Sequence, residues 1–356
     1  MGEEVQPLFP VPSCVLIGKR TEPGRLPATV MRASGQLIHR DASPLEANER
    51  LSWVEENWPQ EATFSGGSPY RAKFKDGATI YPRILCLVTK VPTGALGENR
   101  EAPLVESRRS TQDKEPWKSL RPIRQSVESS FLRSLYLGES IAPFRALSPS
   151  LAVIPWDGTH GLIDAGQARD LGHVNLGRWL AEAERLWTLH GRGRSSFLEQ
   201  LDHLHKLSAQ FPIASRRVLY SKSGTLPAAC VLRDPEGVID HKLYWAPAGD
   251  DEAHFLAAIL NSETARGRVS HLQARGQWGA RDFDKLMFGL PIPKFDQKDR
   301  LHGQLAAAGK RAEEVAYAVP LRERIHFTTA RREIRKALAE DGVGAQIEKL
   351  VEQLLG

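Results

Sequence analysis

The sequence predicts a mixed α/β (α+β) fold in which two lobes with small sheets are joined and braced by helices. Short runs rich in β-branched and aromatic residues alternate with stretches that repeat apolar residues every three or four positions. The clearest helical repeat comprises Leu301, Leu305, Ala308, Ala312, Val315 and Val319. With 356 residues, the chain is long enough for two domains.

The order of these patterns predicts the domain limits. We expect a strand within residues 1–20, a first lobe over 21–165, a helical divider over 166–210, a second lobe over 211–320 and C-terminal helices over 321–356. The predicted strands are 8–18, 84–88, 131–137, 151–155, 217–219, 228–232 and 243–245. The predicted helices are 45–53, 176–187, 197–207, 252–260, 301–319, 328–338 and 343–355.

The stretch SPYRAKFKDGATIYPRILCLV, residues 68–88, predicts a β-hairpin. Arg71 and Lys73 alternate with small or aromatic residues, and Gly77-Ala78 supplies a turn before an apolar strand. Cationic side chains on a hairpin favour a polyanionic ligand over a small molecule. We therefore expect Arg71, Lys73 and Arg83 to contact the phosphates or base edges of DNA, with a solvated hairpin face as the alternative.

Positive charge is concentrated in two parts of the chain. The whole sequence has 48 Lys and Arg against 43 Asp and Glu, a net charge of +5. Residues 71–133 hold thirteen cationic against seven acidic side chains, and residues 322–336 hold six against two. Such concentration is typical of a nucleic-acid-binding face, although basic loops also occur on unrelated soluble proteins.

A long polar connection over residues 92–122 carries much of this charge. Connections of this length are usually functional or disordered. Its cations predict contacts along a phosphate backbone, with disorder in the absence of DNA as the alternative. The candidates in and beside the connection are Arg108, Arg109, Lys114, Lys118, Arg121 and Arg124.

A second candidate recognition segment is the glycine-broken loop ARGQWGARDF, residues 274–283. It combines arginines, an amide and an aromatic residue, which are side chains that read bases. The candidates are Arg275, Gln277, Trp278 and Arg281. The alternative is that Trp278 packs beneath the loop, which is common for tryptophan.

Composition argues against secretion and membrane insertion. Cys14, Cys86 and Cys230 lie far apart, and an odd number of cysteines without metal-ligand spacing fits a reducing cytoplasm. No apolar run approaches the roughly 18 residues of a membrane span. The acidic start MGEEVQPLFP lacks the layout of a signal peptide. We therefore expect a cytoplasmic protein.

Familiar catalytic motifs are missing from the sequence. A methyltransferase acting on an exocyclic amine needs a polar-Pro-Pro-aromatic loop, and none of the five Asn residues precedes Pro, while Asp234-Pro235 is followed by Glu236. There is no glycine-rich nucleotide loop or P-loop. His203 and His205 fall on different helical faces, which disfavours a metal site. The sequence thus predicts a recognition module without catalytic, cofactor or metal residues.

Several motifs in a fixed order resemble the target-recognition region of large bacterial N6-adenine DNA methyltransferases, enzymes of restriction-modification and phage-defence systems. The resemblance covers about residues 64–320. It is carried by SPYR and GATIYPR, VESRRSTQDKEPWKSL, LRSLYLGESIAPFRAL, SKSGTLPAACVLRD, LYWAP, EAHFLAAILNS, GARDFDKL and LPIPKFD. Type I specificity subunits show a looser version of the closing half.

The resemblance implies a fold similar to DNA methyltransferase target-recognition domains and a role in sequence-specific duplex DNA recognition. The family's catalytic domain has no counterpart here, although LFPVPSCVLIGKR resembles the last strand of such a domain. The implied partners are double-stranded DNA and a methyltransferase catalytic domain or subunit, which would bind S-adenosylmethionine and the target adenine. The alternatives are a stand-alone nuclease with scattered carboxylates and a protein-interaction scaffold in phage defence.

Overall fold

A computed structural model describes most of the chain. The described residues are 28–39, 41–57, 67–92, 97, 99–110, 113–191, 195–224, 226–273, 275–276, 279–280, 283, 285–323 and 325–356, with backbone alone at 275–276 and 279–280. The strand predicted at 8–18 and the candidate residues Gln277, Trp278 and Arg281 lie outside them.

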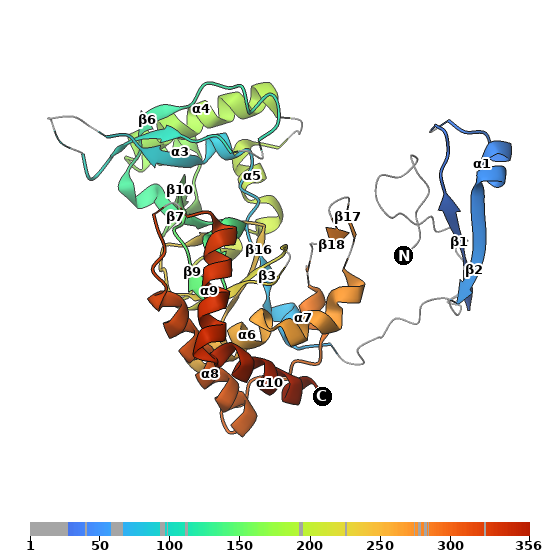
Figure 1. The fold of residues 1–356 in the computed structure, drawn as a ribbon. Helices are drawn as coiled ribbons and strands as arrows, with labels where there is room; N and C mark the ends of the chain where they lie inside the picture. Colours follow the sequence, from blue (N-terminus) through green and yellow to red (C-terminus); the bar gives the residue numbers. More distant parts are fainter. Residues whose placement is uncertain are drawn as a thin grey trace, which may run out of the picture.

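The mixed α/β fold is confirmed, and its first large element is a six-stranded sheet with the order β15-β7-β10-β4-β5-β6. Figure 1 labels β6, β7 and β10 of this sheet. Only β15 runs parallel to its neighbour, β7. The strands are β4 (Leu87–Lys90), β5 (Leu104–Ser107), β6 (Arg124–Ser126), β7 (Leu132–Tyr136), β10 (Ser150–Val153) and β15 (Val238–Ile239). Helices α3 (Ala165–Asp170), α4 (Val174–His190) and α5 (Phe197–Leu201) share the buried core of this sheet.

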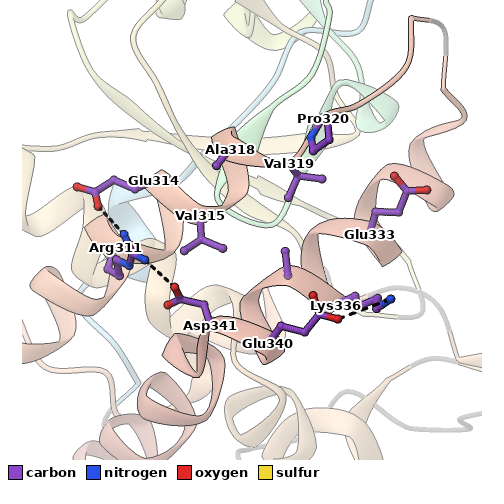
Figure 2. Close-up of a pocket in the computed structure, with 11 residues that line it drawn as sticks. Arg311, Glu314, Val315, Ala318, Val319, Pro320, Glu333, Lys336, Glu340 and Asp341 are labelled. Atoms are coloured by element: carbon purple, nitrogen blue, oxygen red, sulfur yellow. Dashed lines mark hydrogen bonds and ion pairs between the residues drawn. The ribbon is translucent and has the colours of Figure 1, made fainter.

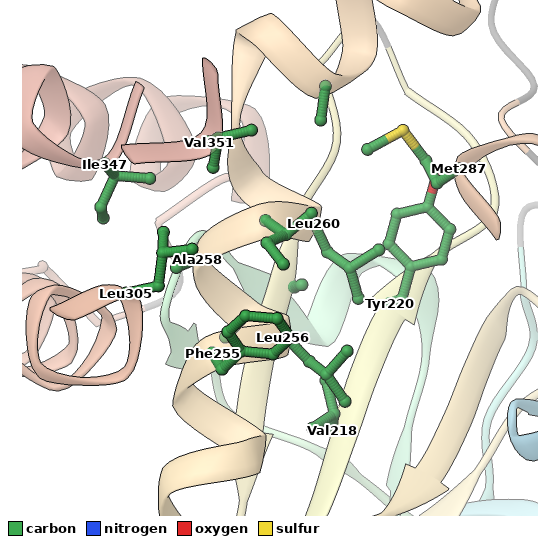
Figure 3. Packing of buried hydrophobic residues seen from close by; sticks show 14 of the residues in the cluster. Val218, Tyr220, Phe255, Leu256, Ala258, Leu260, Met287, Leu305, Ile347 and Val351 are labelled. Carbon is green, nitrogen blue, oxygen red and sulfur yellow. The ribbon is translucent and has the colours of Figure 1, made fainter. Parts of the chain in front are cut away.

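The second sheet has four strands in the order β14-β13-β16-β3. They are β3 (Lys75–Asp76), β13 (Arg217–Ser221), β14 (Ala229–Leu232) and β16 (Leu243–Pro247). Its inner face packs against α6 (Asp250–Asn261), which in turn packs against α8 (Arg300–Ala318) and α10 (Val343–Leu355). Figure 3 shows α6 residues such as Leu256 and Leu260 between Val218 of β13 and Leu305 and Val351 of the outer helices.

Each sheet contains one strand from the other half of the chain. β3 leaves the first half to pair with β16, and β15 leaves the second half to pair with β7. At the crossing, the Gly77 amide donates to Leu243 O (3.0 Å) and the Ala78 amide to Ile239 O (2.7 Å). The two halves are therefore joined by main-chain hydrogen bonds.

The prediction of a β-hairpin over residues 68–88 is wrong. Residues Tyr70–Lys73 form one turn of helix, α2, and β3 pairs with β16 rather than with the apolar run at 84–88. The reason is burial, because Tyr70 and Phe74 lie four residues apart and one helical turn directs both into the core. The apolar run begins as a 3₁₀ turn, Arg83–Leu85, before β4.

Most helix and strand predictions are confirmed. α4, α6, α8, α9 (Phe327–Asp341) and α10 match the predicted helices, and β7, β10, β13, β14 and β16 match the predicted strands. The helix predicted over 197–207 stops at Leu201, because the Asp202 carboxylate accepts the amides of Leu207 and Ser208 and turns the chain. The predicted helix 45–53 ends at Arg50, where a strand begins.

The motif LGESIAPFR, residues 137–145, follows β7 and forms hydrogen bonds with the C-terminal helices. Arg145 donates to Ala316 O (3.0 Å) and Val319 O (2.7 Å) at the end of α8. In return Arg331 of α9 donates to Gly138 O (2.7 Å) and Ile141 O (3.0 Å). Burial lowers the pKa of Arg331 to about 10. Part of the charge at 322–336 therefore braces the fold, contrary to its interpretation as a nucleic-acid-binding face.

A separate β-hairpin precedes the two sheets in the chain. β1 (Thr29–Gly35) pairs with β2 (Leu51–Asn57), and α1 (Pro44–Arg50) lies between them. The remaining short elements are β8 (Ile141–Ala142), β9 (Arg145–Ala146), β11 (Trp156–Asp157), β12 (Gly161–Leu162), α7 (Glu263–Val269), β17 (Arg275–Gly276) and β18 (Gly279–Ala280), with 3₁₀ turns at Ser129–Phe131, Gly138–Ser140, His203–His205, Ser208–Gln210, Ser270–Leu272 and Leu286–Gly289. Among the described helices, none has the length and apolar character needed to cross a bilayer.

The close approach of the two backbone segments predicts that Gly77 cannot be replaced without a loss of stability. A Cβ atom there would overlap the carbonyl group of Asp240. Gly77→Ala should therefore lower the free energy of unfolding by about 1–3 kcal/mol, as other overpacking substitutions do. Urea denaturation measures the change. Gly303→Ala on the open face of α8 is the matched control, since no atom lies near its added methyl and a small gain in stability is expected. Equal stability of the two variants would contradict the prediction.

Candidate nucleic-acid interface

Three lysines from distant parts of the sequence surround one carboxylate, that of Asp76, at the β3–β16 edge of the second sheet. We define the lysine cluster as these three residues, Lys206, Lys222 and Lys285, together with Lys75, which precedes Asp76 on β3 and lies on the opposite face of the strand, over Trp245. Lys222 forms an ion pair and hydrogen bond with Asp76, and the Lys206 Nζ lies 3.8 Å from Asp76 Oδ2. Four lysines against one aspartate give a net charge of +3.

Aromatic rings hold these lysines in place. The Lys222 Nζ lies 4.2 Å from the ring centroid of Tyr244, and the Lys285 Nζ lies 5.4 Å from the same centroid. The Lys75 Nζ lies 5.5 Å from the Trp245 ring. Both rings are buried and project from β16. Cation–π contacts of this kind hold the ammonium group of a lysine at a defined position, and this group can still be reached from solvent.

The pKa of Asp76 reflects both its burial and the charges of the lysines around it. Partial burial raises the pKa of this carboxyl, but the hydrogen bond from Lys222 and the charges of Lys222, Lys206 and Lys285 outweigh burial, so the net shift is downward. Asp76 is therefore ionised at neutral pH. It lowers the repulsion among the lysines without cancelling their charge.

The cluster lies at the base of the predicted base-reading loop. Backbone strands β17 and β18 pair at Arg275↔Ala280 and Gly276↔Gly279, so the loop is built as a short hairpin. Just after this hairpin, the Phe283 amide donates to Lys222 O (2.7 Å). Phe283 is fully buried and anchors the returning chain beside Lys222.

The structure also brings the segment around Arg71 to this place. Phe74 stacks on Phe288 with ring centroids 4.5 Å apart, and the Ser68 amide donates to Phe288 O (3.1 Å). Residues 68–76 therefore pack against the segment that follows β18. Arg71 is exposed on α2. The segment that carries Arg71 thus packs against the chain that follows β18, although the two are about 200 residues apart in sequence.

Two cations predicted to contact DNA have internal partners instead. Lys73 binds both carboxylate oxygens of Glu252 (2.9 Å each), beside the Tyr70 hydroxyl, which donates to the same residue. Arg83 is only 7% exposed and lies 3.7 Å from the buried Asp240 carboxylate. Neither side chain stands on an open hairpin face, because that hairpin does not form.

The third predicted set forms a separate basic surface on the first sheet. We call it the basic edge, because it follows β5 and includes the edge strand β6. Its members are all exposed and comprise Arg108, Arg109, Lys114, Lys118, Arg121 and Arg124. Arg108 donates to Ser150 Oγ (2.8 Å) and Arg109 to Leu120 O (2.8 Å).

A buried tryptophan fixes the loop of the basic edge. Trp117 is 4% exposed and stacks on Trp187 of α4 with centroids 5.8 Å apart. This packing explains the resemblance motif Pro-Trp-Lys, since the ring anchors the loop and leaves Lys118 exposed. The predicted polar connection is thus partly ordered within the described residues.

The lysine cluster was missed by sequence reasoning. Its members are separated by up to 210 positions and meet only through the strand exchange and the packing of the second sheet. Lys222 and Lys285 each lie within a motif that carries the family resemblance, and Lys75 falls within the basic region 71–133. Their meeting point follows from tertiary structure.

A pocket of about 700 Å³ between α8 and α9 does not share residues with either basic surface (Figure 2). Its charged residues are largely paired, with Arg311 Nη2 2.6 Å from Asp341 and Lys336 3.6 Å from Glu340. Four carboxylates against two cations line it, so it disfavours a polyanion. Within the described residues, no group of three or more His, Cys, Asp or Glu side chains is arranged to hold a metal ion.

Comparisons with known proteins give a loose structural likeness. No protein-family model and no curated protein matches the chain. The Type IIL restriction-modification enzyme MmeI in complex with DNA matches at 9% identity with a TM-score of 0.48, and the type IIG restriction endonuclease BpuSI at 11% with 0.35. Each match covers 91% of this chain but 38% and 40% of those chains, respectively. The chain spans about two fifths of their length, and TM-scores below 0.5 are too low to assign a function.

The depressed pKa of Asp76 predicts how stability depends on pH. An unfolded aspartate titrates near 3.8, and the folded value is lower, so the stabilisation by Asp76 is fully present above this pH and is lost as pH falls through the folded pKa. The difference in unfolding free energy between wild type and Asp76→Asn should therefore shrink below about pH 4. Denaturant titrations between pH 7 and pH 3 measure it. Asp41→Asn, an exposed site before α1, is the control; a constant difference for Asp76→Asn would refute the prediction.

Proposed function

We propose that this chain is a sequence-specific duplex DNA recognition module that positions a target adenine for an N6-adenine methyltransferase domain outside the chain. The observation that carries the proposal is the lysine cluster at the base of the β17–β18 hairpin. The cluster places positive charge beside Phe283, which follows the β17–β18 hairpin, and the sequence of this segment includes arginine and amide side chains of the kind that read bases. The ordered motifs that resemble methyltransferase target-recognition regions support it.

The chemistry of the two parts differs in the way that DNA recognition requires. Lysine ammonium groups act as point charges that suit phosphate oxygens of any sequence, and such contacts fix the register of a protein on the duplex. Arginine and amide side chains can instead form bidentate hydrogen bonds with base edges in the major groove. The lysine cluster would supply the first kind of contact, and Arg275, Gln277 and Arg281 the second.

The basic edge would extend the phosphate contacts along the duplex. Its side chains are exposed and stand on an ordered sheet and loop. Binding to the flanking duplex assists a base-modifying enzyme, because turning a base out of the stack costs a few kcal/mol of free energy. Contacts on both sides of the target would offset that cost.

We place the methyl-transfer chemistry and S-adenosylmethionine in a separate catalytic domain or subunit. At two strand-to-helix turns, where a nucleotide-like cofactor often binds, the chain presents carboxylates. Asp164 already caps the first amides of α3, and α6 begins with Asp250, Asp251 and Glu252. Carboxylates of this chain thus already lie at the helix N-termini, where a bound anionic group would otherwise be favoured.

A nuclease or a protein scaffold would behave differently in solution. Magnesium-dependent cleavage of plasmid DNA would favour a nuclease, and no measurable affinity for duplex would favour a scaffold. Tight binding to one duplex sequence without cleavage would favour a recognition module. The two basic surfaces give the third outcome a physical basis that the others lack.

Neutralising the lysine cluster should weaken binding to every duplex alike. We expect Lys75→Gln, Lys206→Gln and Lys285→Gln together to reduce affinity at low salt. The slope of log Kobs against log salt concentration should flatten by about 0.9 for each phosphate contact that the substitutions remove. Lys222 is left in place because its contacts with Asp76 and Tyr244 also support the fold. Fluorescence anisotropy with a labelled random duplex measures both quantities.

A variant with the same change in net charge controls for long-range electrostatics. Lys310→Gln, Lys336→Gln and Lys349→Gln remove three exposed lysines from α8, α9 and α10. This variant should retain the wild-type slope, since its lysines belong to neither basic surface. If both triple variants flatten the slope equally, overall charge explains binding and the lysine cluster is not the contact surface.

The hairpin that follows α7 should determine sequence choice. We expect Arg275→Ala to change the motif recovered from a random duplex pool, while its affinity for random duplex changes little. Removal of one bidentate hydrogen-bond pair to a base should cost about 1–3 kcal/mol on the preferred site. Arg71→Ala on the exposed face of α2 provides the comparison for a phosphate-type contact. Recovery of the wild-type motif by Arg275→Ala would remove this residue from the base-reading set.

A further inference from the structure

Arg83 occupies the point where the two basic surfaces connect. Its guanidinium is buried, with Nη1 3.2 Å from Ser110 Oγ and Nη2 3.7 Å from Asp240 Oδ1. Its backbone amide also donates to Asp113 Oδ1 (3.3 Å). One residue therefore contacts the loop of the basic edge and the β15–β16 turn, which are far apart in sequence.

On one side these contacts define the start of the basic edge. The second carboxylate oxygen of Asp113 accepts the Ser110 amide (2.8 Å), which links these two residues directly. Arg108 and Arg109 immediately precede Ser110, and Lys114 immediately follows Asp113. The contacts of Arg83 with Ser110 and Asp113 thus determine where these exposed cations stand.

On the other side the contacts lead to the lysine cluster. Asp240 is fully buried, and its carboxylate accepts the Lys242 amide (3.0 Å) and lies 3.1 Å from His241 Nδ1. The carbonyl group of Lys242 in turn accepts the amide of Lys222 (3.1 Å). A continuous series of polar contacts therefore runs from the basic edge through Arg83 to Lys222.

We infer that Arg83 is a positioning residue that fixes the basic edge relative to the lysine cluster, so that both meet one duplex in register. The inference rests on the proposed function and assigns Arg83 an indirect role in place of the direct DNA contact expected from sequence. A buried carboxylate that loses its cation is strongly unfavourable. The pair of Arg83 and Asp240 therefore holds one arrangement of the two surfaces rather than a range of them.

The shape of the guanidinium matters as well as its charge. Two terminal nitrogens reach Ser110 and Asp240 at once, whereas the single ammonium of lysine reaches one partner at a time. Arg83→Lys should therefore keep the fold while releasing one of the two sides. Arg83→Met should release both.

Hydrogen exchange of the free full-length chain provides the first readout and needs no DNA. With Arg83→Met and Arg83→Lys, amides within 107–121 and 240–242 should exchange at least several-fold faster than in wild type. Arg145→Met is the matched control, because Arg145 likewise links segments far apart in sequence, by donating to Ala316 O and Val319 O, but touches neither basic surface. It should speed exchange around 138–146 and 316–319 only. Unchanged exchange at 107–121 in both Arg83 variants would overturn the inference.

Duplex binding provides the second readout and separates the inference from the proposed function. For Arg83→Lys, the slope of log Kobs against log salt concentration should become shallower by about one unit for each phosphate contact that the variant no longer makes. For Arg145→Met, this slope should equal that of wild type. A wild-type slope in Arg83→Lys, despite faster exchange, would overturn the positioning role. If wild type itself shows no salt-dependent binding, the proposed function fails, and exchange alone decides whether Arg83 orders the basic edge. Should Arg83→Met not fold, Asp240→Asn tests the same link from its other end, with faster exchange at 107–121 expected.

Discussion

The close approach of two backbone segments, at Gly77–Ala78 and at Ile239–Asp240, is the constraint on which the rest of the structure depends. Only a glycine fits beside the Asp240 carbonyl group. This contact lets β3 and β15 cross into the opposite sheets. It also buries Asp240, which then requires Arg83 as a cationic partner. The backbone crossing therefore determines both the union of the two halves and the polar contacts at their junction.

Regular elements were predictable from sequence because their signal is local. The apolar repeat of α8 and the short apolar runs of β10 and β14 each indicate a buried element without reference to distant residues. The stretch 68–88 failed for the opposite reason. Its alternation suggested a local hairpin, but Asp76 pairs with Tyr244, 168 residues further on. Strand exchange leaves no periodic signal in either partner, so a single sequence cannot reveal it.

The candidate interface likewise has one part that the sequence predicts locally and one part that depends on distant residues. Charge counting located the basic edge, because its cations lie within 17 consecutive residues, from Arg108 to Arg124. The lysine cluster could not be counted, since its members are scattered along the chain. Counting also cannot tell an exposed arginine from a buried one. Arg83 and Arg331 contribute to local charge excess, yet the structure uses both to hold backbone segments together.

The lysine cluster also illustrates why a binding surface would contain a carboxylate. Without a counter-ion, the ammonium groups of Lys206, Lys222 and Lys285 would repel one another and move apart in solution. Asp76 instead holds Lys222 and Lys206 in place in the free chain, and the rings of Tyr244 and Trp245 lie against Lys222 and Lys75. Side chains ordered before binding lose less conformational entropy when a ligand arrives. Asp76 thus exchanges one unit of positive charge for a surface whose remaining +3 is already arranged to meet a phosphate backbone.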